Sequence, residues 1–314
     1  MYGEMKVFSG RSNPVLAQEI CCYLGVPLEG VDIIDFPNEN VFAKLHHSVR
    51  GHDVFVIQTA SSPVNRNIIE LLILLDTLKR ASADRITAVI PFFPYARSDK
   101  KDQPRVPITA RLMADIITVA GANRYITIDL HRGQIQGFFS IPGDELTALH
   151  LLSDYFRQKD LRNGVVVAAD LGFAKRARNF AQEVEMPLAL IEKRRVGNVP
   201  GSEALTLIGE VRDKDVIIAD DEVLTGTSLV EAAEILKEHG ARDIYASFTH
   251  PAFSPDAPER LRKAKIKEMV TTNTLPIPPE RMLPNITVLS VAPLLGEVIR
   301  RVHEGRSVGE LFNE

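Results

Sequence analysis

The chain has 314 residues, of which 45% are hydrophobic and 25% charged, and its formal net charge is −4. These values describe a soluble globular protein that is long enough for two domains with real cores. The slight negative charge argues against nonspecific binding of nucleic acid. No apolar run reaches the roughly 20 residues of a membrane-spanning helix, and the N-terminus lacks a signal-peptide pattern. The two cysteines, Cys21 and Cys22, cannot form a disulfide framework, so we expect a reduced, cytoplasmic protein without membrane or nucleic-acid partners.

Apolar runs typical of strands alternate with helical patterns along nearly the whole chain. Strands are predicted over residues 5–8, 54–58, 86–93, 125–130, 165–169, 188–191, 215–219 and 244–248. Helices are predicted to begin at 12–14, to run over 65–80, from Pro107 to Gly121, and over 229–239. This alternation implies right-handed βαβ units, so the predicted fold class is α/β with mainly parallel sheets flanked by helices.

A weak internal repeat indicates two related halves. Residues 121–131 resemble residues 240–250, since both segments begin with a Gly-Ala pair that ends a helix and close on a histidine. Chance is the alternative explanation. The segment 141–144, Ile-Pro-Gly-Asp, interrupts the pattern between the halves. We therefore predict domains over 1–148 and 149–314, with the last helix free to pack on the first domain and a ligand loop at the carboxyl end of each sheet.

An acidic loop lies at a predicted strand-to-helix junction. Asp220 and Asp221 follow the apolar run 215–219, and the Thr-Gly-Thr-Ser segment 225–228 leads into the next helix. Backbone N–H groups at a helix start favour a phosphate, whereas carboxylates bind sugar hydroxyls directly or through Mg²⁺. The motif therefore predicts a site for a phosphorylated sugar. The alternative is an ordinary acidic loop with a Ser or Thr helix cap.

Two basic stretches also follow predicted strands. The first is the loop 94–105, whose cations can neutralise a polyphosphate, although such a charge run can also be merely solvated. These cations are Arg97, Lys100, Lys101 and Arg105. The second, 191–198, precedes Pro200-Gly201-Ser202, and we predict a mobile loop whose cations close over a transferring phosphoryl group. His131 and Asp170 also follow strands, and a lone histidine there can be structural or metal-binding.

Together these stretches resemble ribose-phosphate pyrophosphokinase, also called phosphoribosyl pyrophosphate synthetase, over nearly the whole chain from Phe8 to Glu304. The motifs that carry the resemblance are segments 8–14, 94–102, 129–139 and 193–195. The resemblance implies two phosphoribosyltransferase-like domains, with an active site between them that a neighbouring subunit completes. It further implies transfer of pyrophosphate from MgATP to the 1-hydroxyl of ribose 5-phosphate, giving phosphoribosyl pyrophosphate and AMP for nucleotide biosynthesis.

Site residues follow from matching positions in the family. The transition-state cations are Lys193 and Arg195. The ATP-binding positions are Phe36, Asn38, Glu39, Asn40, Arg97, Ser98, Asp99 and Lys100. The ribose 5-phosphate positions are Asp220, Asp221, Leu224, Thr225, Gly226, Thr227 and Ser228. The Mg²⁺ positions are His131 and Asp170. Transfer of this kind depends on positioning and electrostatics, so no covalent nucleophile is expected.

Several family positions are altered in this chain. The family pattern Asp-Asp-x-x-Asp-Thr-(Ala/Gly)-Gly-Thr has Leu224 in place of its third acid and Thr227 in place of glycine, which we expect to crowd the turn. The Phe-x-Asp-Gly-Glu segment against adenine reads Phe-Pro-Asn-Glu-Asn at 36–40, and the Asp-His-Gly-Gly segment reads Asp-Leu-Gly-Phe at 170–173.

These changes leave two alternatives to an active synthetase: a non-catalytic regulatory homologue, and a phosphoribosyltransferase. The retained Lys193 and Arg195 speak against the first. The basic loop 94–105 and the first half of the chain have no role in the second. The resemblance also implies a dimer-based homo-oligomer, commonly a hexamer. Ser48, Arg50 and Ser82 match positions at which family members bind a phosphate or ADP effector.

Overall fold

The computed structural model describes residues 3–161, 163–195 and 203–311, without the side chains at 193–195, 203–205 and 310. It contains two compact units. Unit 1 consists of Met1–Thr147, Thr274–Pro276 and Ser290–Glu314, and unit 2 of Ala148–Asn273 and Ile277–Leu289. The C-terminal segment therefore belongs to the same unit as the N-terminal half.

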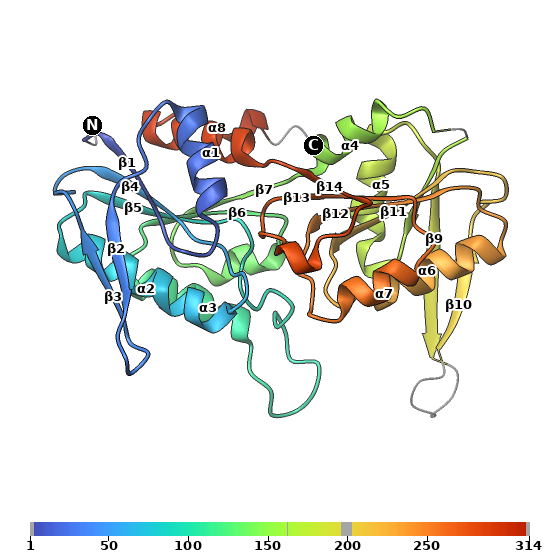
Figure 1. Cartoon of the computed structure of the whole chain (residues 1–314), viewed down its shortest axis with the longest axis horizontal. Helices are drawn as coiled ribbons and strands as arrows, with labels where there is room; N and C mark the ends of the chain where they lie inside the picture. The colour runs from blue at the N-terminus through green and yellow to red at the C-terminus, as the bar shows by residue number, and fades with distance from the viewer. Residues whose placement is uncertain (1–2, 162, 196–202, 312–314) are drawn as a thin grey trace. The chain divides into compact units, whose positions relative to one another are not determined.

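Unit 1 is built on a five-stranded sheet in which every neighbouring pair of strands is parallel. In spatial order the strands are β1 (Met5–Ser9), β4 (Asp53–Ile57), β5 (Arg85–Ile90), β6 (Arg124–Ile128) and β7 (Gly143–Leu146). Helices α2 (Val64–Arg80) and α3 (Thr109–Ala120) cover one face, while α1 (Pro14–Leu24) and α8 (Ala292–Glu304) lie on the other (Figure 1). Because both faces are covered, β4 is apolar and buried along almost its whole length.

A separate antiparallel hairpin, β2 (Val31–Asp35) and β3 (Val41–Leu45), stands beside this sheet and was not predicted. One of its faces packs on the core beneath α2 through Val31, Ile33, Ala43 and Leu45. Ile34 and Phe42 point from the opposite face and are exposed. The hairpin thus gains its fixed place from the contact with α2, since two strands alone are marginally stable in water.

Helix ends in unit 1 follow local chemistry. The side chain of Asn13 accepts a hydrogen bond from the Leu16 backbone N–H, and Pro14 occupies the first turn of α1. Helix α3 begins at Thr109 instead of the predicted Pro107, because Ser98 Oγ accepts the Thr109 backbone N–H at 3.2 Å. It ends at Gly121, as predicted.

Unit 2 is built on a seven-stranded sheet that is parallel except for its β9–β10 edge. In spatial order the strands are β10 (Glu203–Ile208), β9 (Leu188–Arg195), β8 (Val165–Ala168), β11 (Val216–Glu222), β12 (Ile244–His250), β13 (Glu268–Thr272) and β14 (Ile286–Leu289). Helices α6 (Thr227–Glu238) and α7 (Ala257–Lys263) pack on one face, where Leu229, Leu236 and Leu261 join the core.

The opposite face of the unit 2 sheet is covered by α4 (Leu149–Arg157) and α5 (Ala174–Glu183). There the rings of Phe156 and Phe180 meet edge to face, and Phe156 packs in the same way against Tyr245 of β12. The 3-10 turns complete the described elements: η1 (Gly133–Phe138), η2 (Leu171–Phe173), η3 (Pro279–Arg281) and η4 (Gly309–Leu311).

The predicted fold class is confirmed, since each unit has a mainly parallel sheet flanked by helices. The two copies of the internal repeat contain β6 and β12, which neighbour β5 and β11 in their sheets. The prediction of a loop directly after the strand 188–191 is wrong. Residues 192–195 extend β9 instead, because they pair antiparallel with β10. The remainder of that predicted loop, 196–198, lies outside the described residues. Within the described part of the chain, no helix has both the length and the apolar character to cross a bilayer.

Candidate functional site

The acid pair lies at the carboxyl end of β11 in unit 2. Asp220 and Asp221 are themselves strand residues. Asp220 pairs with Phe248 of β12, and Asp221 is only 6% exposed. Their oxygens are already engaged by the backbone: Asp220 Oδ1 accepts the Asp221 N–H at 2.9 Å, and Asp221 Oδ1 accepts the Glu222 N–H at 3.0 Å. These bonds fix the direction of both carboxylates on a rigid strand, which suits residues that must align a substrate.

The surroundings of Asp220 disfavour the ionised form of its carboxyl group. Burial, the neighbouring Asp221 carboxylate and, more weakly, Asp170 raise the pKa of Asp220 well above its ordinary value of 3.8. Asp170 follows β8, the strand next to β11, and its Oδ1 accepts the Phe173 backbone N–H at 3.0 Å. The two adjacent strands thus bring acids together at one edge of the sheet. Cations or hydroxyl donors bound there would relieve the repulsion.

The turn after the acids requires its glycine. Gly226 has φ +75° and precedes α6 as its N-cap, where it supplies no capping side chain. A Cβ at this position would come within 2.9 Å of Leu261 Cδ2. Thr227 is the first residue of α6 and Thr225 Oγ1 donates to its Oγ1 at 3.1 Å. The expected crowding by Thr227 is therefore wrong, because the left-handed residue of the turn is Gly226.

The segment around α7 donates hydrogen bonds to backbone carbonyls of the same turn. Arg260 Nη1 donates to the Thr225 carbonyl at 2.6 Å, and the Ser254 N–H donates to the Leu224 carbonyl at 2.9 Å. The Leu224 side chain is 41% exposed, so the position of the family's third acid carries an apolar group in contact with solvent. Sequence patterns missed Arg260, since nothing links it to the loop before the fold is known.

The predicted cations at 193 and 195 lie on a strand that projects beyond its neighbour. The last ladder pair between β8 and β9 joins Ala168 to Leu190, so the Lys193 backbone lies three residues, about 10 Å, past the end of β8. Figure 1 shows the β9–β10 hairpin extending away from the sheet. The side chains of Lys193 and Arg195 lie outside the described residues.

The basic loop of unit 1 connects β5 to α3. Arg97 and Lys100 are exposed, whereas Asp99 is 7% exposed and accepts a hydrogen bond from Gln134 Nε2 at 2.7 Å. Ser98 is held at the start of α3 through Thr109. Two of the four predicted ATP contacts in this loop therefore hold the loop in shape, while the cations face solvent.

His131 follows β6 at the same carboxyl edge of the sheet and is half-buried. It precedes η1, which supplies the Gln134 bond to the basic loop, so the histidine and the loop are parts of one connected edge. Within the described ranges, no cluster of three or more His, Cys, Asp or Glu side chains is arranged to hold a metal. His131 and Asp170 belong to different units.

The predicted adenine-contact segment forms the turn of the β2–β3 hairpin. The Phe36 ring is 47% exposed and lies 6.0 Å from the Phe42 ring, centroid to centroid. The Phe36 N–H donates to the Asn40 carbonyl at 2.8 Å, the Asn40 N–H donates to Asn38 Oδ1 at 3.3 Å, and Glu39 has φ +67°. All four predicted contacts are exposed at this turn.

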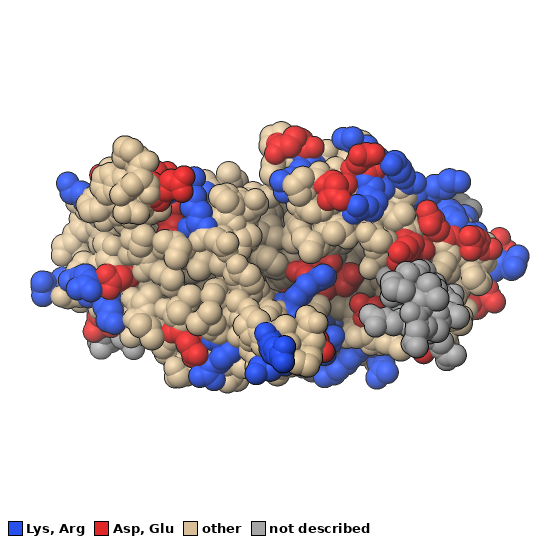
Figure 2. Space-filling view, turned by 90° about the horizontal axis from the view of Figure 1, so that it is seen from below, with Lys and Arg blue, Asp and Glu red and all other residues tan. Residues whose placement is uncertain are grey.

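The charged surface does not single out a site by itself. On the face seen in Figure 2, acidic and basic side chains lie intermixed, without one continuous area of a single sign. On this face, therefore, no charged area marks a binding surface, and the candidate residues are recognised by their positions in loops at strand ends.

Known proteins of one enzyme family are similar to this chain over nearly its whole length. A model of the N-terminal domain of ribose phosphate pyrophosphokinase matches residues 5–121, and a model of the phosphoribosyl synthetase-associated domain matches 193–313. The chain is 49% identical to a ribose-phosphate pyrophosphokinase of Caldanaerobacter subterraneus and 47% identical to one of Wolinella succinogenes, each over 98% of both chains. It is similar to the crystal structure of phosphoribosylpyrophosphate synthetase from Mycobacterium smegmatis, with a TM-score of 0.92, 41% identity, and coverage of 96% of this chain and 100% of that one.

Proposed function

Since the chain belongs to the ribose-phosphate pyrophosphokinase family, we propose that it transfers the pyrophosphoryl group of MgATP to the 1-hydroxyl of ribose 5-phosphate. The hydroxyl oxygen bonds to the β-phosphorus, and the bond from that phosphorus to the α–β bridging oxygen breaks. AMP leaves with the bridging oxygen, and the hydroxyl loses its proton. The products are phosphoribosyl pyrophosphate and AMP.

The observation that carries the proposal is the junction of β11 and α6. It combines fixed carboxylates with the N-terminus of a helix whose N-cap residue is a glycine. Asp220 and Asp221 accept hydrogen bonds from the ribose hydroxyls, and the 5-phosphate binds the backbone N–H groups and hydroxyls of 225–228. Donation by sugar hydroxyls stabilises the ionised form of Asp220 against the groups that raise its pKa.

ATP is assigned to unit 1. Arg97 and Lys100, both exposed in the basic loop, neutralise the phosphates, with Ser98 and Asp99 holding that loop in place. The turn 36–40 contacts the base, with the Phe36 ring as its apolar surface and the amides of Asn38 and Asn40 as hydrogen-bonding groups.

Mg²⁺ is the expected cofactor, and the proposed donors are of chemical types that can ligate a metal ion. Asp170 and His131 supply oxygen and imidazole donors. Burial raises the pKa of Asp220, and the neighbouring Asp221 and Asp170 carboxylates raise it further, so a bound cation would stabilise the ionised form of Asp220. When bound, Mg²⁺ neutralises phosphate charge and orients the phosphates. The chain's own cations, Lys193 and Arg195, stabilise the charge that grows on the transferring group.

The assembly and its regulation belong to the same proposal. A dimer-based homo-oligomer, of hexamer size, is expected by light scattering after size exclusion, with a monomer mass of 34.8 kDa. Ser48, Arg50 and Ser82 form the proposed effector position for phosphate or ADP. The Gly51 N–H donates to the Ser82 carbonyl at 3.0 Å, and the Arg50 N–H donates to Ser48 Oγ at 3.4 Å, so two separate turns meet there.

The test is the formation of AMP from purified protein, ribose 5-phosphate and MgATP, with omission of each substrate as the control. AMP that requires both substrates supports the synthetase. ATP binding without AMP formation would instead support a non-catalytic regulatory homologue. Release of pyrophosphate from phosphoribosyl pyrophosphate with a free base, without AMP formation from ATP, would support a phosphoribosyltransferase.

A further inference from the structure

The nucleotide turn 36–40 is carried by a hairpin that has no backbone hydrogen-bonded ladder to the five-stranded sheet. Its antiparallel ladder joins only β2 to β3. The direction of the turn therefore depends on side chains that connect the hairpin to the rest of unit 1. One residue at the end of β2, Asp35, directly precedes Phe36 and is the centre of such contacts.

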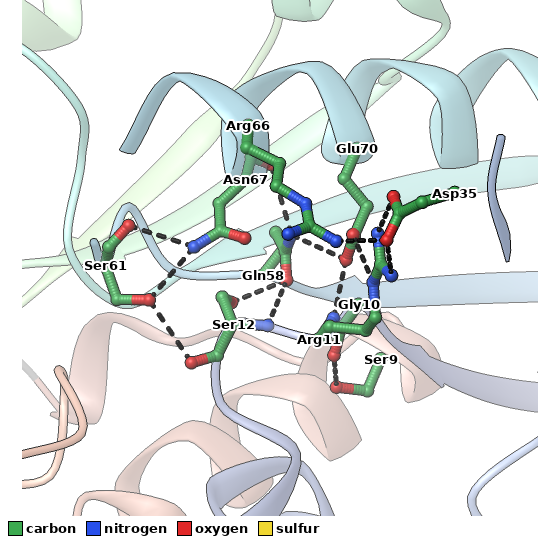
Figure 3. Close-up of polar contacts among 10 residues, drawn as sticks. All are labelled: Ser9, Gly10, Arg11, Ser12, Asp35, Gln58, Ser61, Arg66, Asn67 and Glu70. Carbon is green, nitrogen blue, oxygen red and sulfur yellow. Dashed lines mark hydrogen bonds and ion pairs between the residues drawn. The ribbon is translucent and has the colours of Figure 1, made fainter. Parts of the chain in front are cut away.

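Arg11, in the loop after β1, joins Asp35 to the core of the unit (Figure 3). Its Nη1 and Nη2 donate to Asp35 Oδ2 and Oδ1 at 2.7 and 2.9 Å, so the guanidinium binds the carboxylate of Asp35 in a bidentate manner. Its Nε donates to Glu70 Oε2 at 2.7 Å, and its backbone N–H donates to Glu70 Oε1 at 2.6 Å. One planar guanidinium thus binds two carboxylates on two different elements.

The anchor on the far side of Arg11 is rigid. Glu70 lies on α2 and is 0% exposed, so its charge must be compensated inside the protein. Gln58, at the carboxyl end of β4, donates to Glu70 Oε1 at 3.1 Å and accepts the Ser12 hydroxyl at 2.5 Å. A Cβ on Gly10 would lie 2.3 Å from Gln58 Oε1, so a glycine is needed for this close approach.

Asp35 has a second partner, also from α2. Arg66 pairs with Asp35 Oδ2, so two guanidinium groups converge on this one carboxylate (Figure 3). The first turn of the same helix also bonds the basic loop, because Tyr95 Oη donates to Asn65 Oδ1 at 2.5 Å. The start of α2 therefore contacts both segments assigned to ATP, through consecutive residues.

We infer that Arg11 is a positioning residue for nucleotide binding: anchored on buried Glu70, it grips Asp35 and so orients the turn 36–40 toward the nucleotide. This role rests on the proposed function, since it assigns the turn to ATP. The interaction of Arg66 with Asp35 is weaker than that of Arg11, because the Arg66 side chain is 48% exposed and is not hydrogen-bonded to Glu70. The specificity of the site for the nucleotide base then depends on residues that do not touch the nucleotide.

Arg11→Lys separates this role from simple stability. A lysine ammonium can neutralise Glu70 but cannot bind both carboxylates in the planar geometry of a guanidinium. We expect the melting temperature to stay near that of the wild type, while the KM for ATP rises about fivefold and the KM for ribose 5-phosphate stays unchanged. Asp35→Asn removes the negative charge and one of the two acceptor oxygens that bind Arg11 and Arg66, and it leaves Glu70 paired, so we expect a rise in the KM for ATP at least as large.

The sign of the Asp35→Asn effect is informative. Removal of an acid near a binding site for a polyphosphate would by charge alone tighten ATP binding. A weaker affinity therefore reports loss of orientation. Arg80→Ala is the matched control, because Arg80 also pairs with an aspartate of α2, Asp76, but at the last residue of the helix, away from Arg66 and Glu70. We expect Arg80→Ala to leave the KM for ATP unchanged.

The experiment measures both KM values, the melting temperature, and the Kd of MgATP by isothermal titration for the wild type and the three variants. An unchanged KM and Kd for ATP in Arg11→Lys and Asp35→Asn overturns the inference, and so does an equal rise in both KM values. The proposed function fails separately, when the wild type forms no AMP. In that case the Kd values of MgATP for the wild type and the variants still test whether Arg11 positions the turn. If the wild type binds no MgATP, the positioning role of Arg11 is overturned as well.

Discussion

Gly226 offers a direct test of how the sugar-phosphate turn is built. Replacement by alanine adds one methyl group at a residue with φ +75°. The left-handed backbone alone costs about 1–2 kcal/mol for a residue with a Cβ. In addition, the new Cβ would lie 2.9 Å from Leu261 Cδ2 and 3.0 Å from Leu261 Cγ. Leu261 is 1% exposed, so it cannot move aside into solvent, and overpacking of this kind costs about 1–3 kcal/mol.

The two costs can be separated within this chain. Gly25 has φ +72°, and its added Cβ would meet nothing within 4 Å. Gly25→Ala therefore measures the backbone cost alone, about 1–2 kcal/mol, whereas Gly226→Ala is expected to lose about 3 kcal/mol in total. The turn that binds the 5-phosphate should also be displaced, so the KM for ribose 5-phosphate should rise more than the KM for ATP.

Urea unfolding of both variants gives the free energies, and a cycle with Leu261→Ala identifies the contact. In the Leu261→Ala background, adding Gly226→Ala should cost no more than Gly25→Ala does in the wild type, because the obstructing side chain is gone. An equal cost of Gly226→Ala in both backgrounds would refute the steric argument. A rise in the KM for ATP alone would refute the assignment of the turn to the sugar phosphate.

Two substitutions and one labelling experiment test the electrostatics and the thiols. Asp220→Asn should abolish turnover yet raise the melting temperature near pH 7, because the pKa of Asp220 in the folded protein lies above 3.8 and its ionisation therefore costs stability as the pH rises. The gain in melting temperature should vanish toward pH 4, and a lower melting temperature at pH 7 would contradict this reasoning. Lys193→Ala should lower kcat at least about 100-fold with little change in the Kd of MgATP, whereas a large loss of affinity at unchanged kcat would argue against its role. A thiol reagent should label the exposed Cys22 in the folded protein and Cys21 only after unfolding, because burial shields Cys21 and raises its pKa to about 11. Rapid labelling of both cysteines in the folded protein would show that Cys21 is accessible.

Local patterns in the sequence predicted most of the parallel strands and helices α1, α2, α3 and α6, but gave no ranges for α4, α5, α7 and α8. The apolar run before Asp220 predicts β11, and the Asn13-Pro14 pair predicts the start of α1. These features depend on residues close together in the chain. The β2–β3 hairpin was missed because its exposed face carries the apolar residues Ile34 and Phe42, which hide the alternation of apolar and polar residues. The burial of its other face comes from the contact with α2.

Prediction of the site residues from the sequence is limited in the same way. Asp220, Gly226 and Arg97 stand in motifs whose spacing already indicates their chemistry. Arg260 stands in no such motif, and the motif that contains Arg11, segment 8–14, does not indicate its partner. Each arginine acts across a long sequence separation, on Thr225 and on Asp35. The misassigned loop at 192–195 has the same cause, because a charged segment becomes a strand only when β10 pairs with it. Pairing partners distant in the sequence are what a single sequence does not reveal.

The central claim is that two phosphates move together from the nucleotide to the sugar. Phosphorus NMR of the wild-type protein with ATP, Mg²⁺ and ribose 5-phosphate follows this transfer directly. We expect the β- and γ-phosphate signals of ATP to be replaced by a mutually coupled pair attached to carbon 1 of the sugar, with AMP appearing at an equal rate. Formation of ADP with a singly phosphorylated product or free phosphate would contradict the account.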